Sequence, residues 1–313
     1  MYREWSTKSG LVCLMALTFV SGGLMAQDTM RVTHILGLEG LPNNTNGSLS
    51  IQGDALRFQK DEGPSAQISI ASIQDIFLGE QDKQIGGTPM ALGRAGAPFG
   101  GGRAIALFSH KKYDTLTLEY RDSNGGLHGA ILQLNKGQGQ GLKDKLAAGG
   151  ARVTPVSSSA TQYNSAAQWS VQVDKVDPGD VDLDPAFRFA IYENLLVELA
   201  KEKQFKQVFR SGDHNATGTS GLLILKTTVQ NFTPGSETKR AVTTVAGATK
   251  LKVRSQLCTP DGKVVVEKVV DGNVRFFGGN LRATHNLAHH VADTIKQSAL
   301  PEPVAAVRTS GGL

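Results

Sequence analysis

The chain has 313 residues, of which 40% are hydrophobic and 19% charged, and its 33 Lys and Arg against 28 Asp and Glu give a formal net charge of +5. This length allows about two domains, and the hydrophobic content supports a core in each. The basic residues are scattered along the chain, which argues against nucleic acid as a partner because proteins of that class carry a dense basic surface. A mild positive charge suits a protein that meets anionic surfaces.

Residues 1–26 have the pattern of a signal peptide. Arg3 and Lys8 precede an apolar run at residues 10–20, and small residues then lead to Ala26, after which we expect cleavage. The run is shorter than the about 20 apolar residues of a transmembrane helix, and no later segment reaches that length. An uncleaved anchor is the alternative, because Leu24 is larger than the residue preferred there. We therefore expect export to the periplasm, the outer membrane or the medium, with no transmembrane segment after signal removal.

The two cysteines are Cys13, inside the apolar run, and Cys258, at the end of a predicted strand. Removal of the signal peptide leaves one thiol, so we expect no internal disulfide in the exported chain. Cys258 follows apolar residues, which favours a small buried hydrophobic side chain over a reactive nucleophile.

The first predicted module spans residues 44–150 and follows a loose, polar segment at residues 27–43. Apolar residues alternate in it at Leu49 and Ile51 and again at Leu56 and Phe58, which predicts a hairpin. Further strands are expected at residues 68–77, 104–108, 116–120 and 130–134, with a polar turn at 109–113 and a closing helix at 141–148. The glycine-rich residues 86–102 lack the Gly-Lys-Ser/Thr end of a phosphate-binding loop, so they are interpreted as a hairpin connection.

This order of strands and one final helix resembles the pleckstrin-homology-like (PH-like) barrel of bacterial proteins. The resemblance is carried by Leu-Phe-Ser-His-Lys-Lys-Tyr-Asp-Thr-Leu-Thr-Leu-Glu-Tyr at residues 107–120 and by Gly-Ser-Leu-Ser-Ile at residues 47–51. Eukaryotic relatives hold phosphoinositides with a basic hairpin, to which Lys111 and Lys112 could correspond. A solvated turn is the better interpretation, because an exported bacterial protein does not meet those lipids and exposed lysines are ordinary.

A small-residue, polar linker at residues 151–166 leads to the second module at 167–300, which a tail at 301–313 follows. Asp184 and Pro185 are a typical N-cap and first helical residue. Strands are expected at 169–173, 205–209, 222–232, 251–257 and 264–270. Two helices are predicted from apolar residues spaced about four apart, Phe187, Ile191, Leu195 and Leu199 in the first and Leu287, Val291 and Ile295 in the second. The sequence thus predicts an α+β fold, its second part a mostly antiparallel sheet with two helices on one face.

The second module is similar to a domain-of-unknown-function family found in exported bacterial proteins, often lipoproteins. The matching residues are Leu-Leu-Ile-Leu-Lys-Thr-Thr-Val-Gln-Asn-Phe at 222–232, Asp-Gly-Lys at 261–263 and Gly-Gly at 278–279. Its layout also resembles the periplasmic domain of the curli-secretion lipoprotein and lipoprotein activators of cell-wall synthases. The resemblance implies a place in the cell envelope, and the family has no established activity to transfer.

Candidate chemistry is sparse. His285 and His289 are four residues apart and would share a helix face, as zinc ligands can, but Asn286 stands where a metalloprotease has glutamate and no third ligand follows from the sequence. No Gly-x-Ser-x-Gly motif of a serine hydrolase occurs. We therefore predict no catalytic residue, cofactor or metal, with His285 and His289 as the candidates should a metal bind. A secreted hydrolase or metal-dependent enzyme is the alternative.

The predicted strand at residues 251–257 indicates a binding surface. Leu251, Val253 and Leu257 would face the core, while Lys252 and Arg254 would face outward, and Arg240 precedes the strand. Such a sheet can take up an anionic partner or an added strand. The prediction is a non-catalytic binding or scaffolding protein of the cell envelope. Arg240, Lys252 and Arg254 are its candidate binding residues, and its partner is an envelope protein or an anionic surface component.

Overall fold

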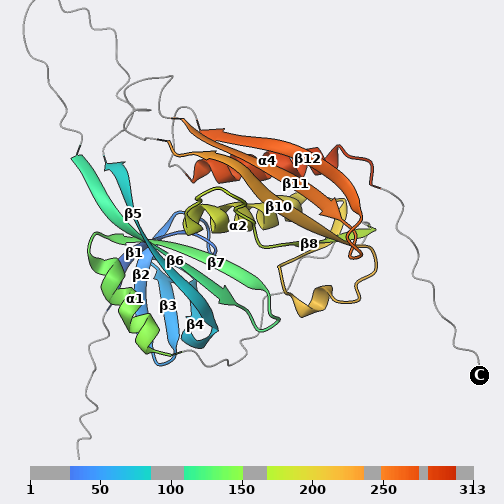
Figure 1. The fold of residues 1–313 in the computed structure, drawn as a ribbon. Helices are drawn as coiled ribbons and strands as arrows, with labels where there is room; N and C mark the ends of the chain where they lie inside the picture. Colours follow the sequence, from blue (N-terminus) through green and yellow to red (C-terminus); the bar gives the residue numbers. More distant parts are fainter. Residues whose placement is uncertain (1–28, 86–108, 151–167, 236–247, 275–280, 301–313) are drawn as a thin grey trace, which may run out of the picture.

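The computed structural model describes residues 29–85, 109–150, 168–235, 248–274 and 281–300 (Figure 1). These residues form two β-sheets and three α-helices, and most strand pairs are antiparallel, so the α+β class is confirmed. Several predictions lie outside the described residues: the signal peptide at 1–26, the glycine-rich connection at 86–102, the strand at 104–108, the linker at 151–166, Arg240, the Gly-Gly pair at 278–279 and the tail at 301–313.

The first sheet has seven antiparallel strands in the order β4-β3-β2-β1-β7-β6-β5. Its described edges are β4 and β5, so these strands form an open sheet and not the closed barrel that was expected. The elements are β1 (Met30–Leu36), β2 (Thr45–Gln52), β3 (Ala55–Lys60), β4 (Ser65–Ser69), a 3₁₀ turn η1 (Ile70–Ser72), β5 (Ile73–Ile85), β6 (Ser109–Arg121) and β7 (Leu127–Asn135). The predicted hairpin of residues 49–58 is confirmed as β2 and β3, which turn through Gly53 at positive φ.

The segment at 27–43, predicted to be loose, instead contains β1, which lies in the middle of the sheet between β2 and β7. Val32, His34 and Leu36 are the buried, alternating residues of β1. Because His34 is polar, the apolar alternation typical of a strand is interrupted in the sequence. His34 is fully buried; its Nδ1 donates to the Pro42 carbonyl (3.2 Å) and its Nε2 accepts from the backbone N–H of Leu38 (3.0 Å). Burial lowers the pKa of His34 and opposes its protonation.

The predicted turn at residues 109–113 is also wrong. These residues begin β6 and pair with residues 81–85 of β5, from Ile85 opposite Ser109 to Gln81 opposite Tyr113. Their polar side chains do not prevent a strand, because the partner strand supplies the backbone hydrogen bonds. The two strands therefore form one long hairpin, whose connection lies outside the described residues.

Helix α1 (Gln138–Ala148) covers one face of this sheet, where Leu142 and Leu146 join the core of the N-terminal half. Strand β7 is buried on both faces along all but its last residue. One face of β7 packs toward α1 through Leu132 and Leu134, and the other packs through Ile131 against the second helix, α2 (Pro185–Lys201). The sheet therefore lies between two helical layers (Figure 1).

The second sheet has five strands in the order β12-β11-β10-β8-β9, and β8 is parallel to both of its neighbours. Its strands are β8 (Trp169–Val173), β9 (Phe205–Phe209), β10 (Leu222–Thr233), β11 (Thr249–Cys258) and β12 (Val264–Val274), with a 3₁₀ turn η2 (His214–Ala216) after β9. Parallel pairing needs a crossover between strands, and α2 supplies the one from β8 to β9. Cys258 is a buried free thiol, as predicted.

Helix α2 (Pro185–Lys201) is the element that both sheets share. The Asp184 carboxylate caps it by accepting from the backbone N–H of Ala186 (2.7 Å), which confirms the predicted start. The predicted apolar stripe is buried, but residues on the other faces, such as Phe189 and Tyr192, are buried too. A helix buried nearly all round belongs between two layers, and α2 lies between the seven-stranded sheet and the five-stranded sheet (Figure 1).

Helix α4 (Arg282–Lys296) lies beside α2 on the inner face of the second sheet, which confirms two helices on one face. Leu287, Val291 and Ile295 form its buried side as predicted, and they share one core with the inward residues of β10 and β11. None of the helices in the described ranges is long and apolar enough to cross a membrane.

Candidate functional site

The outer face of the second sheet carries the predicted binding residues. Along β11, Leu251, Val253 and Leu257 are buried in the core, whereas Lys250, Lys252 and Arg254 point to the opposite side. Lys250 and Lys252 are exposed and Arg254 is half-buried. Alternate residues of a strand are about 7 Å apart, so these three cations make a straight row. We call Lys250, Lys252 and Arg254 the β11 row.

The neighbouring strands leave the β11 row largely unbalanced in charge. On β12 the three residues opposite it are Asn273, Asp271 and Val269, and on β10 they are Thr233, Asn231 and Thr228. Asp271 is therefore the only acidic residue among these six neighbours, and its Oδ1 lies 3.7 Å from the Lys252 Nζ. Val269 is 53% exposed, which places an apolar side chain next to Arg254. The face is mixed in polarity and mildly basic.

The structure keeps two of the three predicted binding residues together and adds one. Lys252 and Arg254 lie in the β11 row, while Arg240 lies outside the described residues. Lys250 was missed because the predicted strand began two residues too late, at Leu251 instead of Thr249. The same alternation, extended back from Lys252 by two positions, identifies it. The Arg254 Nε is buried and has no hydrogen-bond partner in the part of the chain that the structure describes.

His285 and His289 lie on the first half of α4, and both are more than half exposed, as expected for residues beside the buried stripe. Their rings face Glu198 of α2, with the His285 Nδ1 3.6 Å from one carboxylate oxygen and the His289 Nδ1 3.5 Å from the other. Burial alone would raise the pKa of Glu198, but hydrogen bonding and charge attraction from Lys201 outweigh it and lower the pKa. No sequence pattern points to Glu198, because only the packing of α2 on α4 brings it to the histidines.

A buried polar network joins the two halves of the molecule, and sequence reasoning missed it. Glu193 of α2 accepts two hydrogen bonds from Arg210, at 2.8 and 3.1 Å, and one from the backbone N–H of Gly129 on β7 at 2.9 Å. Arg210 also donates to the Leu127 carbonyl at 3.0 Å. Burial by itself would lower the pKa of Arg210, and Glu193 more than compensates, so the pKa is raised. The Tyr192 hydroxyl donates to the same Leu127 carbonyl at 3.1 Å.

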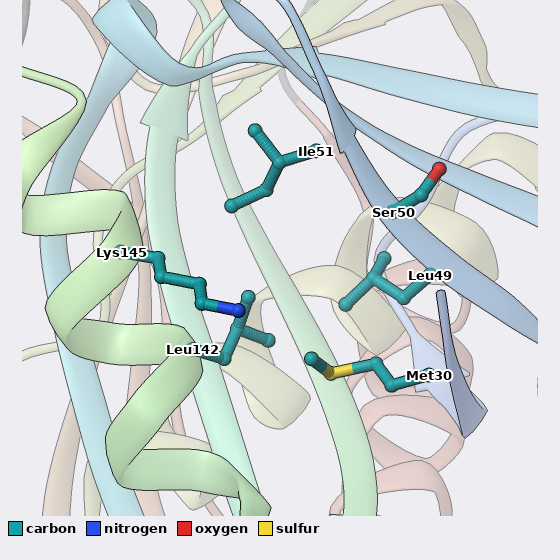
Figure 2. A pocket seen from close by; sticks show the side chains of 6 residues that line it. All are labelled: Met30, Leu49, Ser50, Ile51, Leu142 and Lys145. Carbon is teal, nitrogen blue, oxygen red and sulfur yellow. The ribbon is translucent and has the colours of Figure 1, made fainter. Parts of the chain in front are cut away.

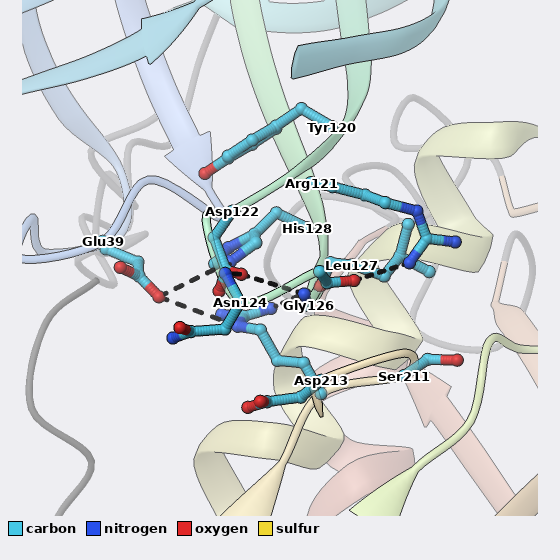
Figure 3. Close-up of polar contacts among 12 residues, drawn as sticks. Glu39, Tyr120, Arg121, Asp122, Asn124, Gly126, Leu127, His128, Ser211 and Asp213 are labelled. Carbon is cyan, nitrogen blue, oxygen red and sulfur yellow. Dashed lines mark hydrogen bonds and ion pairs between the residues drawn. The ribbon is translucent and has the colours of Figure 1, made fainter. Parts of the chain in front are cut away.

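An Asp–His pair lies at the end of this network (Figure 3). The His128 Nε2 is 3.1 Å from the Asp122 carboxylate and 3.7 Å from that of Glu39. Hydrogen bonds from His128 and the backbone offset the effect of burial and lower the pKa of Asp122. Such a pair can serve acid–base catalysis, but the His128 side chain is 1% exposed and its ring stacks on Tyr120 at 4.7 Å between centroids. A substrate cannot reach this imidazole, so the pair holds the β6–β7 turn in place.

Two cavities are too small or too open to define a catalytic centre. The first, of about 40 Å³, lies between α1 and the strands β1 and β2 and is lined by Met30, Leu49, Ser50, Ile51, Leu142 and Lys145 (Figure 2). That volume is close to one water molecule. The second, of about 290 Å³, is an open depression along β5 and β6 that reaches Asp184 and Pro185. It falls at the lower limit of ligand pockets, and the Asp184 carboxylate already caps α2.

No family model matches the chain, and no curated protein matches it. Two solved structures do, both PelC dodecamers from Paraburkholderia phytofirmans. One is 12% identical with a TM-score of 0.32, covering 44% of this chain and 96% of that chain. The other, a point variant, is 13% identical with a TM-score of 0.31, covering 42% of this chain and 92% of that chain. Likeness at this level carries no argument about fold or function.

Proposed function

We propose that the protein is exported and acts in the bacterial cell envelope as a binding or scaffolding protein, not as a catalyst. The basic start, apolar core and small residues of positions 1–26 support export, with a mature chain that begins at Gln27. N-terminal sequencing of the exported form tests this step. A purified envelope or secreted form that still begins at Met1 would contradict it.

A PH-like relationship for residues 44–150 and a relationship of residues 167–300 to exported domains of unknown function belong to the same proposal. The antiparallel strands followed by a covering helix α1 support the first. The pair of helices on one face of the five-stranded sheet supports the second. Both are arguments from layout, and both favour binding surfaces over a catalytic pocket.

The β11 row is the observation that carries the binding proposal. Three cations stand about 7 Å apart along one sheet face, against the single carboxylate of Asp271 among their cross-strand neighbours. A linear arrangement suits an extended anionic component of the envelope better than a compact anion, which needs a concave site. Each exposed cation contributes roughly 0.3–1 kcal/mol to such an interaction. The row as a whole therefore supplies about 1–3 kcal/mol, or a factor of roughly 5 to 150 in affinity.

The test replaces Lys250, Lys252 and Arg254 together by glutamine, which keeps the length and polarity of the side chains. Purified protein is co-sedimented with a bacterial envelope fraction at low and at physiological salt. We expect the triple variant to bind about 5- to 150-fold more weakly, with a flatter dependence on salt. Circular dichroism should show that folding is unchanged, because these side chains lie outside the core.

A matched control removes the same charge from the N-terminal half of the molecule, from strand β3 and from the turn that follows β7. Arg57, Lys60 and Lys136 are replaced by glutamine, which lowers the net charge by three without touching the β11 row. This variant should retain most of the affinity. If the β11-row variant binds as wild type, or if both variants weaken equally, the row is not the binding site and the face is an ordinary solvated surface.

A further inference from the structure

The contacts between α2 and α4 bring histidines and carboxylates together at one point. Two pairs hold the helices side by side: the Asn194 side chain donates to the Thr284 hydroxyl at 3.0 Å, and the Lys296 Nζ lies 3.0 Å from Glu202. Between these pairs lies Glu198, whose side chain is only 6% exposed although it carries a charge. Its two oxygens face the two rings that α4 presents one helical turn apart.

The two histidine–glutamate distances are long for hydrogen bonds and close to the ligand–ligand spacing of a zinc site. The His285 Nδ1 and His289 Nδ1 lie 3.6 and 3.5 Å from the Glu198 oxygens, beyond the roughly 2.7–3.2 Å of an N–H···O hydrogen bond. Ligands that bind zinc at about 2.0–2.1 Å in a tetrahedron are separated from each other by roughly 3.4 Å. Each histidine–Glu198 distance is thus close to one edge of a zinc tetrahedron, although the three side chains do not converge on one point as they stand.

The other nitrogen of His289 is also oriented. Its Nε2 lies 3.3 Å from the carboxylate of Asp293, one helical turn further along α4. Metal-binding histidines commonly use their second nitrogen on a carboxylate in this way, which fixes the ring and increases the basicity of the ligand nitrogen. His290 differs, because its Nδ1 is 2.8 Å from the Asp271 carbonyl on β12. His290 is therefore held away from Glu198 and offers a comparison on the same helix.

We propose that His285, His289 and Glu198 bind a divalent transition-metal ion of the Zn²⁺ type, which links α2 to α4. Two imidazoles and one carboxylate are a ligand set suited to zinc, copper or nickel and unsuited to calcium or magnesium, which prefer oxygen. Asp293 is a positioning residue for His289, and water completes the coordination. The site stands apart from the β11 row and does not depend on the envelope role proposed above.

Two features set the expected strength of the site. As the side chains stand, no three His, Cys, Asp or Glu residues in the described ranges are arranged to hold an ion, so the rings must rotate toward the carboxylate. Both rings are more than half exposed, which leaves them room to do so. Lys201 also pairs with Glu198 and must move away. Its own side chain is 59% exposed, so the ammonium can move into water, and we expect this competition to cost the metal roughly two- to fivefold in affinity.

The test titrates the tag-free exported chain with Zn²⁺ in competition with a chromophoric chelator. Co²⁺ absorption serves as a second readout of coordination. We expect one ion per chain, and His285→Ala and His289→Ala should each abolish most of the binding. Asp293→Asn should weaken it by about 10- to 100-fold, as a change in a residue behind a metal ligand does. Lys201→Gln should tighten it by about two- to fivefold.

The control is His290→Asn, which removes a histidine from the same helix surface and should leave Zn²⁺ affinity unchanged. The histidine variants alter exposed side chains, so circular dichroism in chelator should match wild type. Absence of stoichiometric Zn²⁺ binding by the wild type overturns the proposal. The proposal is also overturned if Zn²⁺ binding survives both His285→Ala and His289→Ala, because the ion then lies elsewhere. It is overturned too if His290→Asn weakens binding as much as these variants do, because histidines then capture the ion nonspecifically.

Discussion

Replacing Glu193 by alanine tests whether the two sheets are held together as one folding unit. Glu193 belongs to α2, is 6% exposed, and bonds both to Arg210 and to the backbone N–H of Gly129 on β7. One side chain thus joins the helix to the first sheet and to the segment that follows β9. This shared contact argues against independent folding of residues 44–150 and 167–300.

The expected loss of stability in Glu193→Ala follows from the groups that lose Glu193 as a partner. Among the described residues, Arg210 stays largely buried and keeps only Glu39, 3.7 Å from its Nε, as a counter-charge, and breaking one side of a buried ion pair costs about 3–5 kcal/mol. The Gly129 N–H loses its acceptor, which adds about 1–3 kcal/mol. Because such costs overlap, we expect a loss of about 4–6 kcal/mol in the free energy of unfolding. Glu193→Gln keeps an acceptor for Gly129 and should cost less.

The assay is urea unfolding followed by far-UV circular dichroism and by the fluorescence of Trp169. Trp5 is the other tryptophan and lies in the proposed signal peptide, so Trp169 on β8 reports on the second sheet in a chain that begins at Gln27. The two signals should change together in wild type, and Glu193→Ala should move both midpoints. Glu62→Ala, which removes an exposed loop carboxylate, is the control and should change stability by less than about 0.5 kcal/mol. The reasoning fails if Glu193→Ala shifts only the Trp169 transition, or if it costs less than about 1 kcal/mol.

Three further predictions concern single contacts, each measured by urea unfolding. A Cβ at position 129 would overlap the Phe189 ring, so Gly129→Ala should cost about 1–3 kcal/mol, and a neutral result would show that α2 packs differently on β7. Asp184→Ala removes the acceptor for the Ala186 N–H and should cost about 1 kcal/mol, whereas Asp184→Ser should retain most of that. Since burial lowers the pKa of His34, the stability from keeping it neutral is present above its ordinary pKa of 6.5 and is lost as pH falls through the lowered value. That loss is at most about 1.4 kcal/mol per pH unit, and it should be absent in His34→Gln; an equal slope in that variant would assign the effect to other groups.

Much of the local structure could be predicted from the sequence, because its causes are local. Asp184 and Pro185 mark the start of α2 by capping chemistry that involves only the next few residues. The spacing of Leu287, Val291 and Ile295 fixes the buried side of α4, and alternation along β11 places Lys252 and Arg254 outward. A residue's place within a helix or strand determines which neighbours share its side, so these predictions needed no knowledge of the rest of the fold.

The features that join distant segments were decided by the tertiary structure alone. No local pattern shows that β1 lies between β2 and β7, since strand order depends on which pairing buries the most apolar surface. Glu193 looks like an ordinary polar position of α2 until the second layer closes over it and turns it toward Gly129. Glu198 likewise meets His285 and His289 only because α2 and α4 pack side by side on one sheet. Packing between layers brings these groups within a few ångströms of one another. Because the residues are far apart in sequence, no periodic pattern in the sequence indicates that they meet.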